Sequence, residues 1–100
     1  MGLYYTLSRE ADHDLEEVFD YTFERYGMDR AVSYVNDFET IFDQLVVNPN
    51  LGRDRSIIRK GLRSITKEKH VIFYRQMQTH IRIIRVLHCS RDLPISFPEE

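Results

Sequence analysis

Three short runs in the second half of the chain place arginine between β-branched or aromatic residues. The runs are Ile58-Arg59-Lys60-Gly61-Leu62-Arg63, His70-Val71-Ile72-Phe73-Tyr74-Arg75 and Ile81-Arg82-Ile83-Ile84-Arg85-Val86-Leu87-His88. Such residues favour strands, in which successive side chains point to opposite faces. We therefore expect strands at about residues 62–66, 70–76 and 81–87, and a sheet whose rigid surface carries arginine side chains at fixed positions.

The first half of the chain follows a helical period instead. Leu3–Leu7 reads as one short strand, and Ser8 can cap a helix that follows it. Apolar residues then recur at helical spacing until Gly27, which ends the pattern. The stripe consists of Ala11, Leu15, Val18, Thr22 and Tyr26, widened by Phe19 and Phe23.

A second helical stripe starts near Asp29 and ends at Asn48-Pro49-Asn50, because proline disfavours helix at the residue before it. Its apolar positions are Ala31, Tyr34, Val35, Phe38, Ile41, Phe42 and Leu45. Only a few residues join the two helices, so they should form an antiparallel hairpin. The order β-α-α-β-β-β predicts an α+β fold, with a helical hairpin packed on one face of a small, mainly antiparallel four-stranded sheet.

The length of 100 residues predicts a single domain over residues 1–100, with Arg91 to Glu100 as a tail that is ordered only if another segment holds it. No apolar run approaches a membrane span, and the N-terminus lacks a signal-peptide pattern. The single cysteine, Cys89, excludes an intramolecular disulfide. We therefore expect a cytoplasmic protein.

Charge is divided unevenly along the chain. Residues 1–50 carry three basic side chains against 11 acidic ones, whereas residues 51–100 carry 11 basic against five acidic. Either the two halves neutralise each other in the fold, or the basic half meets an anionic partner, which could be nucleic acid or an acidic protein segment.

The last two strands can be placed in register if their hairpin closes around Gln78-Thr79. Arg75 then lies opposite Arg82, and two opposed arginines repel each other unless an anion bridges them. The same register pairs Phe73 with Ile84 and Val71 with Val86, on a face shared with His88. The other face carries Ile72, Tyr74, Ile83, Arg85 and Leu87, and we expect it to pack on the helices, with Arg85 paired to an acidic residue of the hairpin.

Few side chains suggest catalysis. No Ser/His/Asp arrangement, phosphate-binding glycine loop or pair of catalytic carboxylates is present, and no residue grouping has zinc-ligand spacing. We expect no metal and no cofactor. His88 is the one plausible general acid or base on the exposed face, because imidazole titrates near neutral pH.

Four segments in this order resemble the RelE/ParE toxins of bacterial type II toxin–antitoxin systems, and ParE-type toxins in particular. They are Asn48-Pro49-Asn50-Leu51-Gly52-Arg53, Arg59-Lys60-Gly61-Leu62-Arg63, His70-Val71-Ile72-Phe73-Tyr74-Arg75 and Ile83-Ile84-Arg85-Val86-Leu87-His88. The resemblance covers about Leu3 to Asp92. It implies a toxin that poisons DNA gyrase, through its A subunit, and a ParD-like antitoxin that neutralises it by wrapping the sheet and the helical hairpin.

The related RelE-type toxins are ribosome-dependent messenger RNA endonucleases. In members with a similar third strand, an arginine follows the histidine of that strand, and a histidine–tyrosine or similar pair ends the last strand. This chain has Val71 and His88-Cys89 there, and valine cannot stabilise the charge of a phosphoryl transition state. The resemblance therefore favours a binding protein over an enzyme.

Two alternatives stay open. One is a divergent nuclease that uses His88 with Arg63 and Arg75, and the other is a non-toxic homologue that only binds its antitoxin. For the leading reading we expect contacts to target and antitoxin through Arg59, Arg63, Phe73, Arg75, Arg82, Ile84 and Val86. The apolar members suit an amphipathic, partly acidic segment that folds on binding. We expect no direct sequence-specific binding of nucleic acid.

Overall fold

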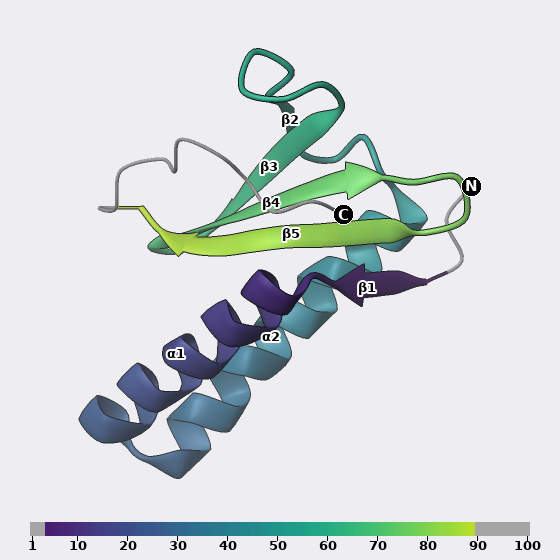
Figure 1. The fold of residues 1–100 in the computed structure, drawn as a ribbon. Helices are drawn as coiled ribbons and strands as arrows, with labels where there is room; N and C mark the ends of the chain where they lie inside the picture. The colour runs from purple at the N-terminus through teal and green to yellow at the C-terminus, as the bar shows by residue number, and fades with distance from the viewer. Residues whose placement is uncertain (1–3, 90–100) are drawn as a thin grey trace.

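The computed structural model describes residues 4–89, which form two layers, a helical hairpin and a sheet (Figure 1). The elements in chain order are β1 (Tyr5–Leu7), α1 (Arg9–Tyr26), α2 (Met28–Val47), β2 (Arg53–Asp54), β3 (Leu62–Lys67), β4 (His70–Gln76) and β5 (Ile81–His88). The predicted α+β class is confirmed, and the predicted β-α-α-β-β-β order holds apart from one additional two-residue strand, β2. The expected tail from Arg91 to Glu100, like Leu3, lies outside the described residues.

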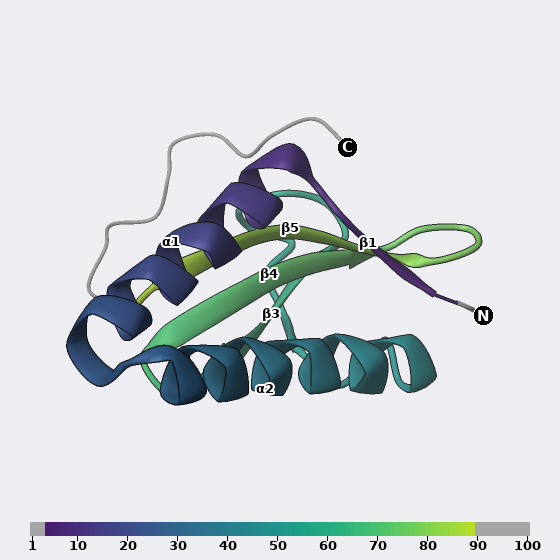
Figure 2. The same cartoon turned by 90° about the horizontal axis from the view of Figure 1, so that it is seen from below.

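Local chemistry starts and ends the helices where the pattern predicts. The Ser8 hydroxyl accepts a hydrogen bond from the Ala11 N–H at 2.9 Å, which caps α1. Gly27 ends α1 and precedes α2 with a φ of +90°, a conformation that side chains with a Cβ rarely adopt. The helices join at Gly27 and diverge from there along the sheet (Figure 2).

Part of the predicted stripe of α1 is wrong. Ala11, Leu15, Val18 and Thr22 are buried, but Tyr26 and Phe23 are exposed. The joined ends of the two helices extend beyond the sheet (Figures 1 and 2), which agrees with the exposure of these two residues near Gly27.

Within residues 4–89 the sheet has five strands in the order β1-β5-β4-β3-β2, not the four expected. The additional strand, β2, is only two residues long and lies within a stretch whose sequence is typical of turns. β1 pairs with β5 in parallel, and the other pairs are antiparallel, so the sheet is mixed.

A bulge changes the expected register of β4 and β5. Arg75 lies opposite Arg82 as predicted, but Phe73 lies opposite Arg85 and not Ile84. One extra residue in β5 at this point moves all later side chains by one position, which exchanges the two faces. The expected pairing of Val71 with Val86 is therefore wrong, since Val71 lies opposite Leu87.

Each face of the sheet has its own buried cluster. The larger cluster lies between the sheet and the helices and includes Phe38, Phe42, Ile72, Ile83 and Val86. The smaller one lies on the reverse side, which is the face away from the helices, and consists of Leu62, Phe73, Ile84 and Leu87 with Ile58 and Val71 packed against them. Val86 therefore lies on the helix-facing side and Leu87 on the reverse side, opposite to the prediction.

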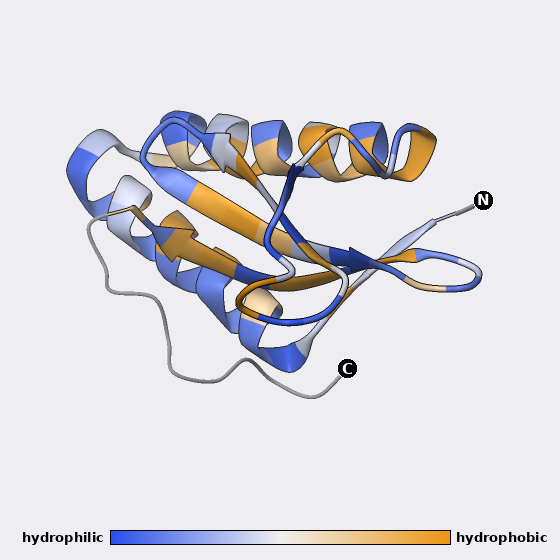
Figure 3. Ribbon diagram, turned by 90° about the horizontal axis from the view of Figure 1, so that it is seen from above, coloured by the Kyte–Doolittle hydropathy of each residue, from blue (hydrophilic) through white to orange (hydrophobic). Residues whose placement is uncertain are grey.

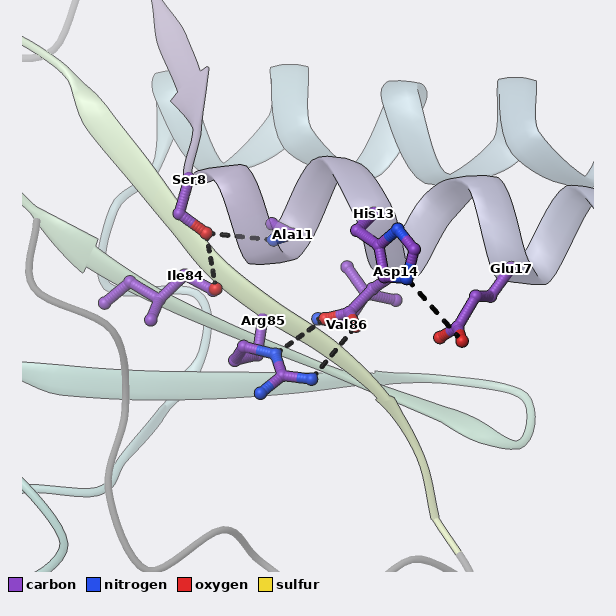
Figure 4. A network of polar contacts seen from close by, with 8 residues as sticks. All are labelled: Ser8, Ala11, His13, Asp14, Glu17, Ile84, Arg85 and Val86. Atoms are coloured by element: carbon purple, nitrogen blue, oxygen red, sulfur yellow. Dashed lines mark hydrogen bonds and ion pairs between the residues drawn. The ribbon is translucent and has the colours of Figure 1, made fainter.

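Two side chains of the first helical segment cover the edge of β5 beyond the end of β1 (Figure 4). The Ser8 hydroxyl donates to the Ile84 carbonyl at 2.7 Å. The Asp14 carboxylate accepts from the Val86 N–H at 2.9 Å and from the Arg85 guanidinium at 2.8 and 3.0 Å. The predicted pairing of Arg85 with an acidic residue of the hairpin is confirmed, and these hydrogen bonds raise the pKa of Arg85.

No helix in the described part of the chain is long and apolar enough to cross a membrane.

Candidate functional surfaces

A groove of about 600 Å³ opens between the hairpin end and the adjacent end of the sheet. Its walls come from α1, α2, the turn between β3 and β4, and the facing ends of β4 and β5. The lining residues include Glu17, Tyr21, Tyr26, Arg30, His70 and His88. Aromatic rings and charges of both signs thus share one concave surface, as is common where proteins bind a partner.

The floor of the groove is formed by two histidines that face each other across β4 and β5. The rings of His70 and His88 lie 5.3 Å apart, and the Tyr34 hydroxyl is 3.0 Å from Nδ1 of His70. Burial lowers the pKa of His70, the neighbouring His88 lowers it further, and Glu68 opposes both effects. The fold therefore favours the neutral form of His70.

His88 does not lie on the reverse side, where it was expected. It pairs with His70, whose ring contacts Phe38 of α2, and the two histidines line the helix-facing groove. The bulge in β5 is the reason, because it reverses the faces of all residues beyond it.

Exposed apolar side chains surround the hairpin end. Tyr21 is 58% exposed and Tyr26 is 68% exposed, and both line the groove. Phe23, Met28 and Val32 are also exposed on the two helices. A patch of this kind on a small domain marks an interaction site. We call the groove with Tyr21 and Tyr26 the groove surface.

The reverse side carries arginines of β4 and β5, and Figure 3 shows hydrophilic segments on this side. Arg75 and Arg82 lie opposite each other on β4 and β5. The segment between β2 and β3 crosses this side (Figure 3), and its Gly61, which follows Arg59 and Lys60 in the chain, lies close to the Arg75 side chain. We call residues 53–61 the basic loop and, together with Arg75 and Arg82, the basic surface.

Arg63 is not part of this surface. It pairs with Tyr74, whose ring packs in the helix-facing core, and its guanidinium donates to the Gly52 carbonyl at 2.8 Å. The four predicted arginines are therefore divided. Arg59, Arg75 and Arg82 share the reverse side, and Arg63 secures the segment that follows α2.

The apolar residues predicted to contact a partner are not accessible. Phe73, Ile84 and Val86 are 1%, 0% and 3% exposed. Phe73 and Ile84 lie in the cluster on the reverse side, which Ile58 of the basic loop joins, and Val86 lies in the helix-facing core. The sequence pattern shows that these residues are apolar. It does not show that a loop without regular structure packs over the reverse side of the sheet and buries part of it.

The residues considered for a nuclease are not brought together. His88 and Arg63 both lie on the helix-facing side. Their partners on β4, His70 and Tyr74, are four residues apart. Four strand residues span roughly 13 Å, which is too far for both to act on one phosphate. Arg75 lies on the reverse side. Within residues 4–89, no group of three or more potential metal-ligating side chains is found.

The groove surface was missed by reasoning from the sequence. Tyr21 lies off the predicted apolar stripe, and Tyr26 is part of the stripe predicted to face the core. The available signal was the clustering of aromatic residues near Gly27, with Tyr21, Phe23 and Tyr26 within six residues.

The helical hairpin on a mixed sheet agrees with the fold that the resemblance to RelE/ParE toxins implies. The family model for the "ParE toxin of type II toxin-antitoxin system, parDE" matches residues 5–93. The chain belongs to this family and is a ParE-type toxin of a type II toxin–antitoxin system.

Named relatives agree with this assignment. Toxin ParE1 of Mycobacterium tuberculosis is 36% identical over 94 residues, which is 93% of this chain and 96% of the relative. Toxin ParE1 of Caulobacter vibrioides is 34% identical over 88% of this chain and 91% of its own length. The solved structure "Chromosomal ParDE TA system from P. aeruginosa" shares the fold, with a TM-score of 0.75 at 24% identity over 88% of this chain and 96% of that one.

Proposed function

We propose that this toxin acts in the cytoplasm on DNA gyrase, holds gyrase in its cleaved-DNA state and is neutralised by a ParD-like antitoxin. The observation that carries the proposal is membership of the ParE family over residues 5–93. The separation of His88, Arg63 and Arg75 supports it, because a nuclease would need its acid or base and its cations around one phosphate.

The groove surface is the proposed docking site of the antitoxin. It combines exposed tyrosines with Glu17, Arg30 and Glu68 around a concave floor. An amphipathic helix could place apolar side chains against Tyr21 and Tyr26 and its polar side chains at the rim. The basic surface lies on the opposite side of the sheet, so we assign it to the gyrase–DNA complex.

A supercoiling assay with purified gyrase tests the proposal. We expect the toxin to inhibit supercoiling and to accumulate cleaved DNA, and we expect Arg75→Ala and Arg82→Ala to weaken both effects. Arg25→Ala, at the hairpin end, is the matched control and should inhibit like the unmodified toxin. Unchanged supercoiling at a stoichiometric excess of folded toxin, with no trapped cleavage complex, would refute the gyrase proposal.

A translating extract separates this function from the nuclease alternative. The proposal expects messenger RNA to remain intact when the toxin is added. Ribosome-dependent cleavage that is lost in His88→Ala would instead establish an enzyme.

A further inference from the structure

We infer that the basic surface binds the sugar–phosphate backbone of double-stranded DNA directly. That this contact occurs in the cell rests on the proposed function, because gyrase would bring the DNA to the toxin. The binding itself requires only toxin and DNA. The partner of the basic surface is thereby named as a nucleic acid rather than a surface of the gyrase protein.

Positive charge is concentrated on this side of the molecule. The basic loop carries Arg53, Arg55, Arg59 and Lys60 against one acidic residue, Asp54. The Asp54 carboxylate accepts hydrogen bonds from the N–H and the hydroxyl of Ser56, so it is engaged within the loop. On the strands beneath, Arg75 and Arg82 lie opposite each other and add two more cations to the same side.

The cations are held in place before any partner arrives. Backbone hydrogen bonds close the basic loop, from the Arg55 N–H to the Leu62 carbonyl at 2.8 Å and from the Ile58 N–H to the Arg55 carbonyl at 2.9 Å. The Arg55 guanidinium donates to the Ser64 hydroxyl at 2.9 Å. A rigid set of cations loses little conformational entropy on binding.

Arg82 is fixed in the same way. Its Nη1 donates to the Thr6 hydroxyl and to the Leu7 carbonyl, each at 3.0 Å. A guanidinium has five N–H donors, so donors remain for a phosphate after these contacts. The planar fork of arginine suits phosphate oxygens better than the point charge of lysine does, and the surface contains five arginines and one lysine.

The surface fits phosphates better than it fits an acidic protein segment. Protein interfaces gain most of their affinity from apolar or aromatic anchors that enter pockets. On the reverse side the large apolar residues Phe73 and Ile84 are already buried, so a peptide finds little to anchor on. Phosphates need only the cations, because release of condensed counterions supplies the free energy.

One apolar residue stands out on the basic loop. Ile57 is fully exposed, between Arg55 and Arg59. An isolated apolar side chain surrounded by cations is how many minor-groove binding proteins contact DNA between base steps. The helical layer would orient the toxin with its basic surface toward DNA. α1 and α2 together carry 11 acidic against three basic residues, so DNA would repel this layer.

Fluorescence anisotropy with a labelled 30-base-pair duplex and the purified full chain tests the inference. We expect a Kd on the order of 10⁻⁵ M at low salt, with an affinity that falls as salt rises and shows no sequence preference. In Arg53→Gln/Lys60→Gln, which removes two exposed cations of the basic loop, the slope of log K against log salt should become shallower by about 2. Ile57→Ser should weaken binding several-fold with an unchanged slope, since it removes no charge.

Arg25→Gln/Arg30→Gln is the matched control, because it removes the same charge from the hairpin end and should leave the slope unchanged. No anisotropy change at 100 µM toxin and low salt would overturn the inference. So would an equal slope in both double variants, or equally tight binding of polyglutamate, which would show that an acidic protein is the partner. Gyrase inhibition without DNA binding would overturn this inference alone, whereas DNA binding without gyrase inhibition would overturn only the proposed function.

Discussion

Asp14 is the residue on which the attachment of α1 to the sheet depends most directly. Asp14 is 3% exposed, and its carboxylate accepts three hydrogen bonds, two from Arg85 and one from the Val86 N–H. Nothing in the helical stripe distinguishes Asp14 from the other acidic residues of α1, so the sequence predicts that Arg85 has an acidic partner but not which one.

Replacing Asp14 with asparagine should lower the free energy of unfolding by about 2 to 4 kcal/mol, because the half-buried Arg85 would lose its charged partner. Urea denaturation followed by circular dichroism measures this. Asp20→Asn, an exposed position on the same helix, is the control and should change the free energy of unfolding by less than about 0.5 kcal/mol. Equal effects of the two substitutions would contradict the structural role of Asp14.

His70 makes stability depend on pH. Its pKa is lowered in the fold from the unfolded value of about 6.5. The unfolded chain therefore takes up a proton more readily, so the stability contributed by His70 is present above pH 6.5 and is lost as the pH falls below it. We expect the urea midpoint to decrease between pH 7.5 and pH 5.5, and His70→Gln to reduce that decrease.

His13→Gln is the control for this measurement, because it removes a histidine whose side chain is 69% exposed on α1. If the midpoint of His70→Gln falls with pH as steeply as that of the unmodified chain, another group carries the effect.

At the scale of elements, the connection from α2 to β3 is organised by one tyrosine. The Tyr74 hydroxyl donates to the Pro49 carbonyl at 2.7 Å and accepts from the Gly52 N–H at 2.8 Å. Gly52 lies so close that a Cβ there would be 2.5 Å from the hydroxyl oxygen. The segment that precedes the basic loop is thus held against β4 by a buried side chain and not by regular structure.

Tyr74→Phe should lower the free energy of unfolding by about 1 to 3 kcal/mol, because it leaves the buried Gly52 N–H without its acceptor. Hydrogen exchange at the Gly52 amide should accelerate by more than global destabilisation explains. Tyr26→Phe, at an exposed tyrosine, is the control. Slow exchange at Gly52 in Tyr74→Phe would mean that another group holds the segment.

The elements themselves could be predicted because each carries a strong local signal. Ser8 and Gly27 mark the ends of α1, and Pro49 marks the end of α2. The bulge in β5 could not be predicted, because no glycine accompanies it and Ile83-Ile84 differs little from any other apolar pair. That one residue decides which face His88, Val86 and Leu87 occupy, so most errors about the candidate site follow from it. The second cover over Phe73 and Ile84 is a tertiary contact of the basic loop, which periodicity does not report.

At the scale of the whole molecule, two layers carry opposite charge. The helices hold 11 acidic against three basic residues, whereas residues 53–89 hold ten basic against two acidic. The sequence predicted this asymmetry and left open whether the halves only neutralise each other. In the fold, Arg85 and Lys67 do pair with acidic helix residues, Asp14 and Asp37, but the basic loop lies on the side of the sheet away from the helices.

This arrangement predicts that antitoxin binding and gyrase inhibition can be separated by mutation. Tyr21→Ser/Tyr26→Ser should weaken antitoxin binding at least tenfold and leave gyrase inhibition intact, because it changes only the groove surface. Arg53→Gln/Lys60→Gln should do the reverse. Calorimetry with the antitoxin and the supercoiling assay measure the two properties. A variant that loses both to the same degree, while still folded, would place both partners on one surface.

The contacts that Ser8 and Asp14 make with the edge of β5 affect when the chain can fold during its synthesis. Residues 5–14 contact residues 81–86 through the parallel pairing of β1 and β5, the Ser8 hydroxyl and the Asp14 carboxylate. These contacts join the beginning of the chain to its last strand, so loop closure over more than 70 residues must come before they can form. These contacts therefore cannot form until residues 81–86 have left the ribosome. An antitoxin already present at that moment would meet its toxin at the point when the toxin first becomes able to act.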